Sequence, residues 1–251
     1  MESSRYHVHG QDIAVIQNYG TGPCVVFLHG LGCSKRSFHH VLEDARFLKH
    51  HFLMIDLPGF GESSAPNYFS YTMEDQAAIV EAMIYQLSFD EVMIVAHSMG
   101  GAVGLLFSEE FHQRISTFVN LEGNLIGSDC GLYSRSIVKK DFEFYKDRLF
   151  PKQVKDAASI PMLDLDQTTP CAMYASARSL VDWSDTSKLL QKYKNLTCRK
   201  AYFFGSENRE IDVLKHLEES ETIEIPHSGH GMMFDNPTGF LDALYQFLFQ
   251  K

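Results

Sequence analysis

The chain has 251 residues, of which 45% are hydrophobic and 22% are charged, and its formal net charge is −10. This composition is ordinary for a globular protein that is large enough to bury a substantial core, as one α/β domain or as two smaller ones. The negative charge argues against nucleic acid or an anionic membrane as the main partner, because both bind cationic faces.

The sequence has no segment typical of export or membrane insertion. Its first ten residues, MESSRYHVHG, are polar, and no apolar run approaches the roughly 20 residues needed to cross a bilayer. Cysteines occur at scattered positions without a CxxC pair, which favours reduced thiols over a disulfide framework or a zinc site. They are Cys24, Cys33, Cys130, Cys171 and Cys198. We therefore expect a cytoplasmic protein without membrane insertion, and its oligomeric state stays open.

The first half of the chain alternates predicted strands and helices. RYHVH and DIAVIQ predict a β-hairpin. The continuous apolar run CVVFLH predicts a strand buried on both faces, followed by a helix at about 37–48 and a second buried strand, FLMID. TMEDQAAIVEAMIYQL has apolar residues at helical spacing, with Thr72 as its N-cap. The strand EVMIVA, another helix and the strand ISTFVNL follow.

Residues 123–195 break this alternation, since they are helical in pattern and rich in aromatic and charged residues. We expect them to form an inserted helical lid, and residues 1–122 and 196–251 to form the core. Strand patterns return in KAYFFG and TIEIP, and the amphipathic helix TGFLDALYQFLF closes the chain. The alternation predicts an α/β fold with a mostly parallel sheet and helices on both faces.

A serine stands where one predicted strand turns into a helix, in IVAHSMGGAVG. Such a turn pushes the Ser98 side chain out over the edge of the sheet. Gly100 and Gly101 allow the helix to approach closely, and the Met99 N–H is left free to bind a developing oxyanion. Ala96 replaces the first glycine of the G-x-S-x-G pattern and is small enough to fit. A serine that merely caps a helix is the alternative interpretation.

Three further motifs support a reactive serine. FLHGLG follows a buried strand, and its turn would direct the Leu31 N–H toward the same oxyanion. DLPGFGES follows the next strand, where we expect Asp56 to brace a loop rather than catalyse. IPHSGHGMMFDNP places His230 after the last strand, where a general base would lie, whereas we expect His227 to be structural.

With HGLG, DLPGFGES, AHSMGG and HSGHGMMFDNP in this order and spacing, the chain resembles the α/β-hydrolase superfamily over essentially its full length. The resemblance implies an eight-stranded, mostly parallel sheet, a lid after the sixth strand and a Ser-acid-His triad. Ser98 and His230 carry over to the triad, and Leu31 and Met99 carry over as oxyanion donors. This mechanism needs no metal or organic cofactor.

The triad acid is less clear, because the usual aspartate after the seventh strand is replaced by Asn208 in FFGSEN. An amide stabilises a histidine cation poorly, and an Asp-to-Asn change in a serine protease costs roughly 10⁴ in turnover. Glu122 follows the sixth strand, where some haloalkane dehalogenases place their acid, and a charge there is costly without a partner. We expect Glu122 to be the acid. Glu207 is the alternative, and a capping or solvent-facing Glu122 also stays open.

These observations predict a serine hydrolase that cleaves a small, mostly apolar carboxylic ester through an acyl-enzyme, with an acyl substrate and water as partners. A serine nucleophile argues against dehalogenases and epoxide hydrolases, which use aspartate there. Thioester, lactone or carbon–carbon bond hydrolysis and a low-turnover small-ligand receptor remain alternatives. Several apolar residues favour an uncharged acyl group if they line the site rather than the core: Leu31, Met99, Met232, Met233 and Phe234.

Overall fold

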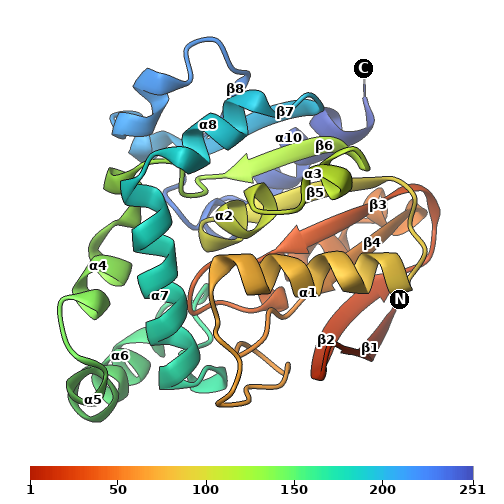
Figure 1. The fold of residues 1–251 in the computed structure, drawn as a ribbon. Helices are drawn as coiled ribbons and strands as arrows, with labels where there is room; N and C mark the ends of the chain where they lie inside the picture. Colours follow the sequence, from red (N-terminus) through yellow and green to blue (C-terminus); the bar gives the residue numbers. More distant parts are fainter. Residues whose placement is uncertain (251) are drawn as a thin grey trace.

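The computed structural model describes residues 1–250 and contains one eight-stranded sheet (Figure 1). The strands are β1 (Glu2–Val8), β2 (Gln11–Asn18), β3 (Thr21–Leu28), β4 (His50–Ile55), β5 (Val92–His97), β6 (Ile115–Leu121), β7 (Arg199–Gly205) and β8 (Thr222–Ile225). Their order is β1-β2-β4-β3-β5-β6-β7-β8. Strand β2 pairs antiparallel with β1 and β4, and the remaining pairs are parallel. The predicted α/β-hydrolase fold with a mostly parallel sheet is confirmed.

The helices lie between the strands and in one long insertion. The α-helices are α1 (Met73–Gln86), α2 (Met99–Leu105), α3 (Glu109–His112), α4 (Leu132–Val138), α5 (Phe142–Phe144), α6 (Phe150–Ala157), α7 (Pro170–Asp185), α8 (Lys188–Asn195), α9 (Met232–Asp235) and α10 (Pro237–Phe249). Short 3-10 helices are η1 (Lys35–Glu43), η2 (Phe47–Lys49), η3 (Gly127–Cys130), η5 (Leu165–Gln167), η6 (Ser206–Asn208) and η7 (Asp212–His216), and η4 (Tyr145–Leu149) is a π-helical turn. As expected, the Thr72 side chain caps α1 by accepting from the Asp75 amide.

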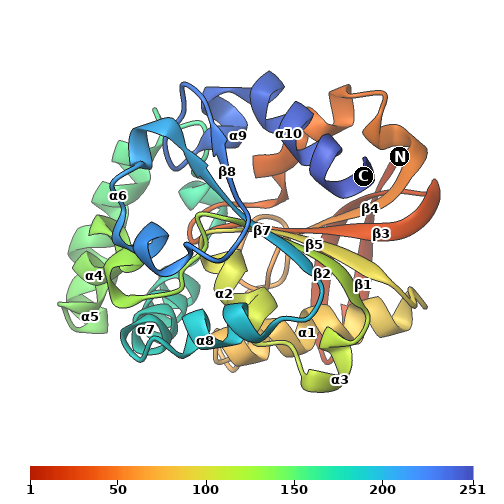
Figure 2. The same cartoon turned by 90° about the horizontal axis from the view of Figure 1, so that it is seen from above.

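Two hydrophobic cores cover the two faces of the sheet. Seen from above, α1, α2, α3 and α8 lie on one face, and α9 and α10 lie on the other (Figure 2). Side chains alternate along each strand, so Val26 and Leu28 belong to the first core while Val25 and Phe27 belong to the second. This double burial explains why β3 is a continuous apolar run.

The segment predicted as a 37–48 helix forms two short 3-10 helices instead, η1 and η2. The buried residues of η1 are Lys35, Ser37, Phe38 and Val41. The segment is kinked at Phe38, whose φ of −109° and ψ of 18° are not helical. The prediction of one continuous helix at about 37–48 is therefore wrong.

Residues 123–195 are here called the lid segment, and its helices α4 to α7 lie beside the carboxyl ends of the strands in Figure 1. They contain helices and turns. The lid segment contacts the core through α7, whose Ser176 hydroxyl donates to the Tyr71 carbonyl at 3.0 Å and whose Ser179 hydroxyl accepts from the Met73 amide at 3.0 Å. Helix α8 lies against the sheet, with the Tyr193 ring centroid 6.4 Å from that of Phe118.

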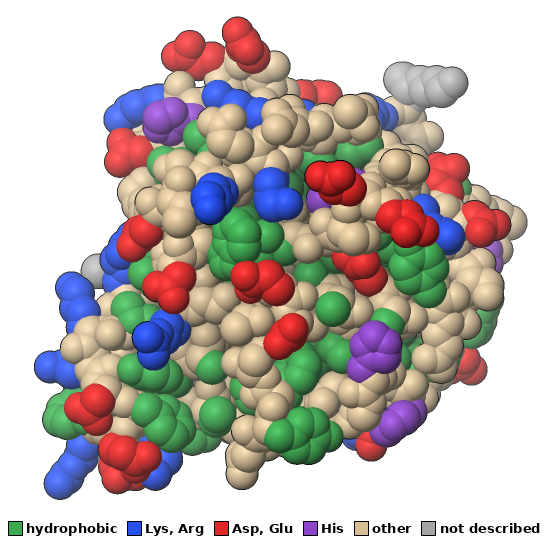
Figure 3. Space-filling model, viewed as in Figure 1, with side chains coloured by type: hydrophobic (Ala, Val, Ile, Leu, Met, Phe, Trp, Pro, Cys, Tyr) green, Lys and Arg blue, Asp and Glu red, His purple; other side chains and the backbone are tan. Residues whose placement is uncertain are grey.

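The described surface carries both signs of charge. On the face shown in Figure 3, acidic and basic side chains are interspersed over the core and the lid segment. Among residues 1–250, none of the helices is both long enough and apolar enough to span a membrane.

Candidate active site

The strand register brings distant parts of the sequence to one edge of the sheet. Leu28 pairs with Ala96 and Leu121 pairs with Phe203, so β3, β5, β6 and β7 end side by side. Residues that follow these strands must therefore emerge together at the carboxyl edge, which is where ligands bind in parallel α/β sheets.

Ser98 occupies the sharp turn between β5 and α2. Its backbone has φ 51° and ψ −118°, a left-handed conformation that costs about 1–3 kcal/mol and exposes the side chain beyond the strand. The first turn of helix α2 lies very close to β3. A Cβ on Gly100 would lie 2.5 Å from the Leu28 carbonyl oxygen, so this position requires glycine.

The Glu122 carboxylate contacts the imidazole of His230. Glu122 follows β6, and its Oε2 accepts a hydrogen bond from His230 Nδ1 at 2.8 Å. The Glu122 side chain is 5% exposed and that of His230 is 43% exposed. With Nδ1 protonated, the neutral imidazole presents an acceptor lone pair at Nε2. The pair joins residues that are 108 positions apart in the sequence.

Asn208, which stands in place of the usual aspartate, contacts the carboxylate of Glu122. Its side-chain amide donates to both Glu122 oxygens, at 2.9 and 2.8 Å, and the Gly205 amide donates to Oε1 at 2.8 Å. Burial alone would raise the pKa of the Glu122 carboxyl. The hydrogen bonds from His230, Asn208 and Gly205 outweigh that effect and hold this pKa below its usual range.

Glu207, the alternative acid, has a different set of contacts. Its backbone amide donates to the Ser228 carbonyl at 3.0 Å. Among the described residues, its carboxylate makes no hydrogen bond to His230, and Glu122 occupies Nδ1 of that ring instead.

His97, next to Ser98, lies under the imidazole of His230. The two ring centroids are 4.7 Å apart, and His97 Nε2 donates to the His230 carbonyl at 3.0 Å. Burial, and then the proximity of His230, lower the pKa of His97 well below its usual value. His97 is therefore neutral and adds no positive charge beside His230.

The predicted amide donors also lie at this edge. Leu31 follows β3 and lines the same cavity as Ser98, while Met99 is the first residue of α2 and has a fully buried side chain. Among residues 1–250, neither the Leu31 amide nor the Met99 amide donates to a protein acceptor. Both groups thus keep their hydrogen-bonding capacity.

Ser98 and His230 line one cavity of about 390 Å³, a size typical of small-molecule sites. The Ser98 hydroxyl has no hydrogen-bond partner among the described residues. The remaining wall comes from His97, from the turn after β3 and from the lid segment. The side chains of the turn and the lid segment are Leu31, Cys33, Asn124, Asp129, Cys130, Tyr133, Ser134, Ile160, Met162, Leu163 and Leu180.

The structure distinguishes between the two interpretations of the apolar sequence candidates. Met232 and Met233 are buried in the core between the sheet and α10, and Phe234 lines a separate, larger hollow of about 1040 Å³. Only Leu31 of that set lines the smaller cavity. Lid residues such as Tyr133 and Met162 provide the apolar wall instead. Helical periodicity alone does not tell which lid face is turned toward the sheet.

Asp129 is the carboxylate of the lid segment that lines the cavity. Its Oδ2 accepts from the Leu125 and Ile126 amides at 2.8 and 2.9 Å. Burial raises the pKa of Asp129 to about 6 despite these hydrogen bonds. Within the described part of the chain, no group of three or more His, Cys, Asp or Glu residues is arranged to hold a metal ion.

A family model for the alpha/beta hydrolase fold matches residues 23–169, which is more than half of the chain. The chain therefore belongs to the alpha/beta hydrolase fold family. This membership supports an enzyme of the hydrolase class.

Individual relatives are more distant. The AB hydrolase superfamily protein YisY of Bacillus subtilis is 28% identical over 92 residues, which cover 37% of this chain and 34% of that protein. The match thus spans about a third of that relative. A crystal structure of the N-acyl homoserine lactonase AidH has a TM-score of 0.81 at 18% identity, covering 99% of this chain and 97% of that one. The esterase EaEST of Exiguobacterium antarcticum has a TM-score of 0.76 at 19% identity, covering 98% and 99%. At such identities the structural likeness shows the fold.

Proposed function

We propose that the protein is a serine hydrolase that cleaves a small, mostly apolar carboxylic ester. Ser98 attacks the acyl carbonyl while His230 takes its proton at Nε2, and the Glu122 carboxylate stabilises the resulting imidazolium. The Leu31 and Met99 amides bind the oxyanion. The alcohol leaves with a proton from His230, and water then hydrolyses the acyl-enzyme. The 2.8 Å contact between Glu122 and His230, at a cavity shared with Ser98, carries this proposal.

The cavity wall supports an uncharged acyl group. Among the described residues, no lysine or arginine lines the cavity, and most of its wall is apolar. Neighbouring structures of an esterase and an N-acyl homoserine lactonase favour oxygen esters and lactones among acyl substrates.

The contact of Asn208 favours turnover over a receptor role. Asn208 in the usual acid position was the feature that suggested a receptor with little turnover. Since its amide donates to the Glu122 carboxylate, the negative charge is supplied by Glu122 and the amide helps to hold it. We also propose a cytoplasmic setting, which agrees with the free thiols of all five cysteines.

The proposal is tested by comparing Ser98→Ala with Ser134→Ala. Both serines line the cavity, but the Ser134 hydroxyl donates to the Cys130 carbonyl at 2.7 Å. A fluorophosphonate should label the wild type and Ser134→Ala stoichiometrically and leave Ser98→Ala unlabelled. Turnover of short p-nitrophenyl esters, a thioester and a lactone should fall by about 10³-fold or more in Ser98→Ala. Undiminished labelling or turnover of Ser98→Ala would overturn the proposal.

A further inference from the structure

Residues 30–34, here called the oxyanion turn, carry the Leu31 amide and are held from the core at their start. The Cys33 amide donates to the Gly30 carbonyl at 3.1 Å, which closes the turn around Leu31. His29 Nδ1 donates to the same carbonyl at 2.8 Å, and His29 Nε2 accepts from the Leu57 amide at 3.0 Å. Burial lowers the pKa of His29, so one neutral tautomer makes both contacts.

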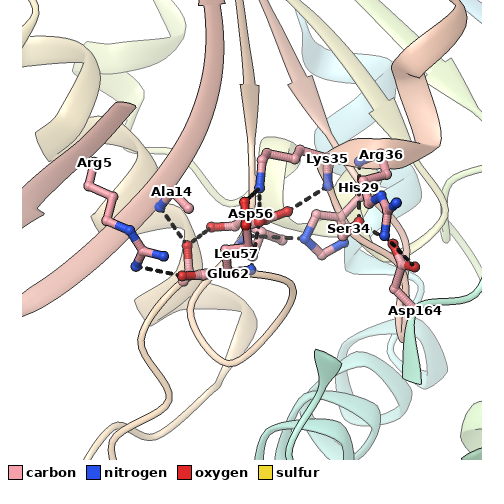
Figure 4. A network of polar contacts seen from close by, with 11 residues as sticks. Arg5, Ala14, His29, Ser34, Lys35, Arg36, Asp56, Leu57, Glu62 and Asp164 are labelled. Carbon is pink, nitrogen blue, oxygen red and sulfur yellow. Dashed lines mark hydrogen bonds and ion pairs between the residues drawn. The ribbon is translucent and has the colours of Figure 1, made fainter. Parts of the chain in front are cut away.

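The core also holds the chain directly after the turn (Figure 4). The Lys35 amide donates to Asp56 Oδ1 at 2.6 Å, and Lys35 Nζ contacts Asp56 Oδ2 at 2.5 Å and Glu62 Oε2 at 2.6 Å. The side chains of Lys35 and Asp56 are only 4% and 0% exposed. Asp56 thus braces this loop, as the sequence predicted, and it fixes the far end of the oxyanion turn.

The middle of the turn is held from the lid segment. The Asp164 amide donates to the Gly32 carbonyl at 2.9 Å. The Ser34 hydroxyl donates to the Asp164 carboxylate (Figure 4). Gly32 has a φ of +73°, and a Cβ there would lie 2.6 Å from Leu165 Cδ2. The turn and the lid segment are therefore packed together at Gly32, across 130 residues of sequence between Ser34 and Asp164.

With these contacts made, the Leu31 amide is left without a protein acceptor at the cavity wall. We propose that Asp164 is a positioning residue: through Ser34 and Gly32, the lid segment holds the Leu31 amide where the oxyanion forms. This inference rests on the proposed serine hydrolysis. An oxyanion donor stabilises the transition state only if its direction is fixed before the charge develops. The seated lid would thus complete the donor pair as well as cover the substrate.

Loss of the Asp164 carboxylate should affect kcat rather than KM. Removing the Asp164 carboxylate takes away the acceptor of the Ser34 hydroxyl, whose oxygen still accepts from the Arg36 amide at 3.2 Å. The backbone contact between Asp164 and Gly32 and the core contacts of His29 and Asp56 remain. The turn should then loosen at Leu31 without unfolding the core. Since the oxyanion exists only in the transition state, kcat should fall and KM should change little.

The experiment measures Asp164→Ala, Ser34→Ala and the double variant with one p-nitrophenyl ester. We expect kcat to fall about 10-fold to 100-fold, because removing a whole oxyanion donor costs about 10²–10³. KM should stay within about twofold, and affinity for a trifluoromethyl ketone should fall by the same factor as kcat/KM. The Ser34 hydroxyl also accepts from the Arg36 amide at 3.2 Å, so Ser34→Ala removes this cap of η1 as well. The double variant should therefore be no worse than Ser34→Ala alone, since the contact with Asp164 is already lost there. Asp164→Asn keeps an acceptor oxygen and should restore much of the loss.

Arg36→Gln is the matched control. Arg36 Nη1 lies 3.9 Å from Asp164 Oδ1 and its side chain is 73% exposed, so this change should leave kcat unaltered. A loss that appears in KM alone, or a fall in kcat with unchanged ketone affinity, would overturn the inference. Ser34→Ala provides the same test if Asp164→Ala fails to fold. Failure of the serine mechanism itself is recognised separately, by turnover that survives in Ser98→Ala.

Discussion

The Glu122–His230 pair and the oxyanion turn lie in one cavity but are held by different parts of the molecule. Among the described residues, the groups that donate to the Glu122 carboxylate belong to His230, Asn208 and Gly205, all outside the lid segment. The oxyanion turn is held from the core and also contacts Asp164 of the lid segment. In the proposed mechanism, proton transfer and charge stabilisation should therefore respond to different perturbations. Changes in the lid segment should alter oxyanion binding and specificity while the acid–base pair stays intact.

The largest effect is expected at Glu122, the acid of the proposed triad. Glu122→Gln keeps the shape of the side chain but removes the negative charge beside His230. We expect kcat to fall about 10³–10⁴-fold, as for the corresponding amide change in a serine protease. Glu207→Gln is the control and should stay within a few-fold of the wild type in the same ester assay. A loss confined to Glu207→Gln would contradict the assignment of Glu122.

A smaller effect is expected at Asn208, which donates to Glu122 without touching His230. Asn208→Ala should lower kcat about 10-fold, because the carboxylate loses two hydrogen bonds of about 1–3 kcal/mol each and becomes less well oriented. Arg209→Gln, a change at the exposed neighbour that pairs with Glu224, should have no such effect.

Asn208→Ala should also change how the free energy of unfolding depends on pH. The folded-state pKa of Glu122 lies below its ordinary value, so its stabilising contribution is complete above that value and is lost as the pH falls through the folded pKa. In Asn208→Ala the pKa should move upward, and the contribution at neutral pH should shrink. Urea unfolding from about pH 7 to about pH 3 should therefore show less loss on acidification than in the wild type. An unchanged difference across this range would contradict the role of Asn208.

The smallest effect is expected at Asp129 of the lid segment and concerns the preference for uncharged over anionic acyl groups. Because the pKa of Asp129 is raised to about 6, its carboxyl becomes charged as the pH rises through that value. Discrimination against anionic acyl groups should therefore increase above about pH 6. Asp129→Asn should reduce the kcat/KM ratio of a butyrate ester to a succinate monoester by about threefold to tenfold at pH 8 and leave it unaltered at pH 5. Asp166→Asn, in the larger hollow, is the control. Equal ratios in both variants at pH 8 would contradict this role.

Sequence patterns could predict the sheet because burial on both faces leaves continuous apolar runs, as in β3. They could also place Ser98, His230 and Glu122 at strand ends, where parallel strands converge. They could not predict the contact between Asp164 and Ser34, since both are ordinary polar residues in turns. The kink of η1 at Phe38 was also missed. Such features depend on partners that only the folded chain brings near.

Two thiols in the cavity wall, those of Cys33 and Cys130, bear on covalent chemistry at this site. Burial raises the pKa of Cys33 to about 12 and also raises the pKa of Cys130. Thiols alkylate through their thiolate, which both residues form sparingly at neutral pH. Soft electrophiles such as maleimides should therefore react little with these thiols inside the cavity. Irreversible ligands designed for it should instead carry a hard electrophile that reacts with the proposed nucleophile, the Ser98 oxygen.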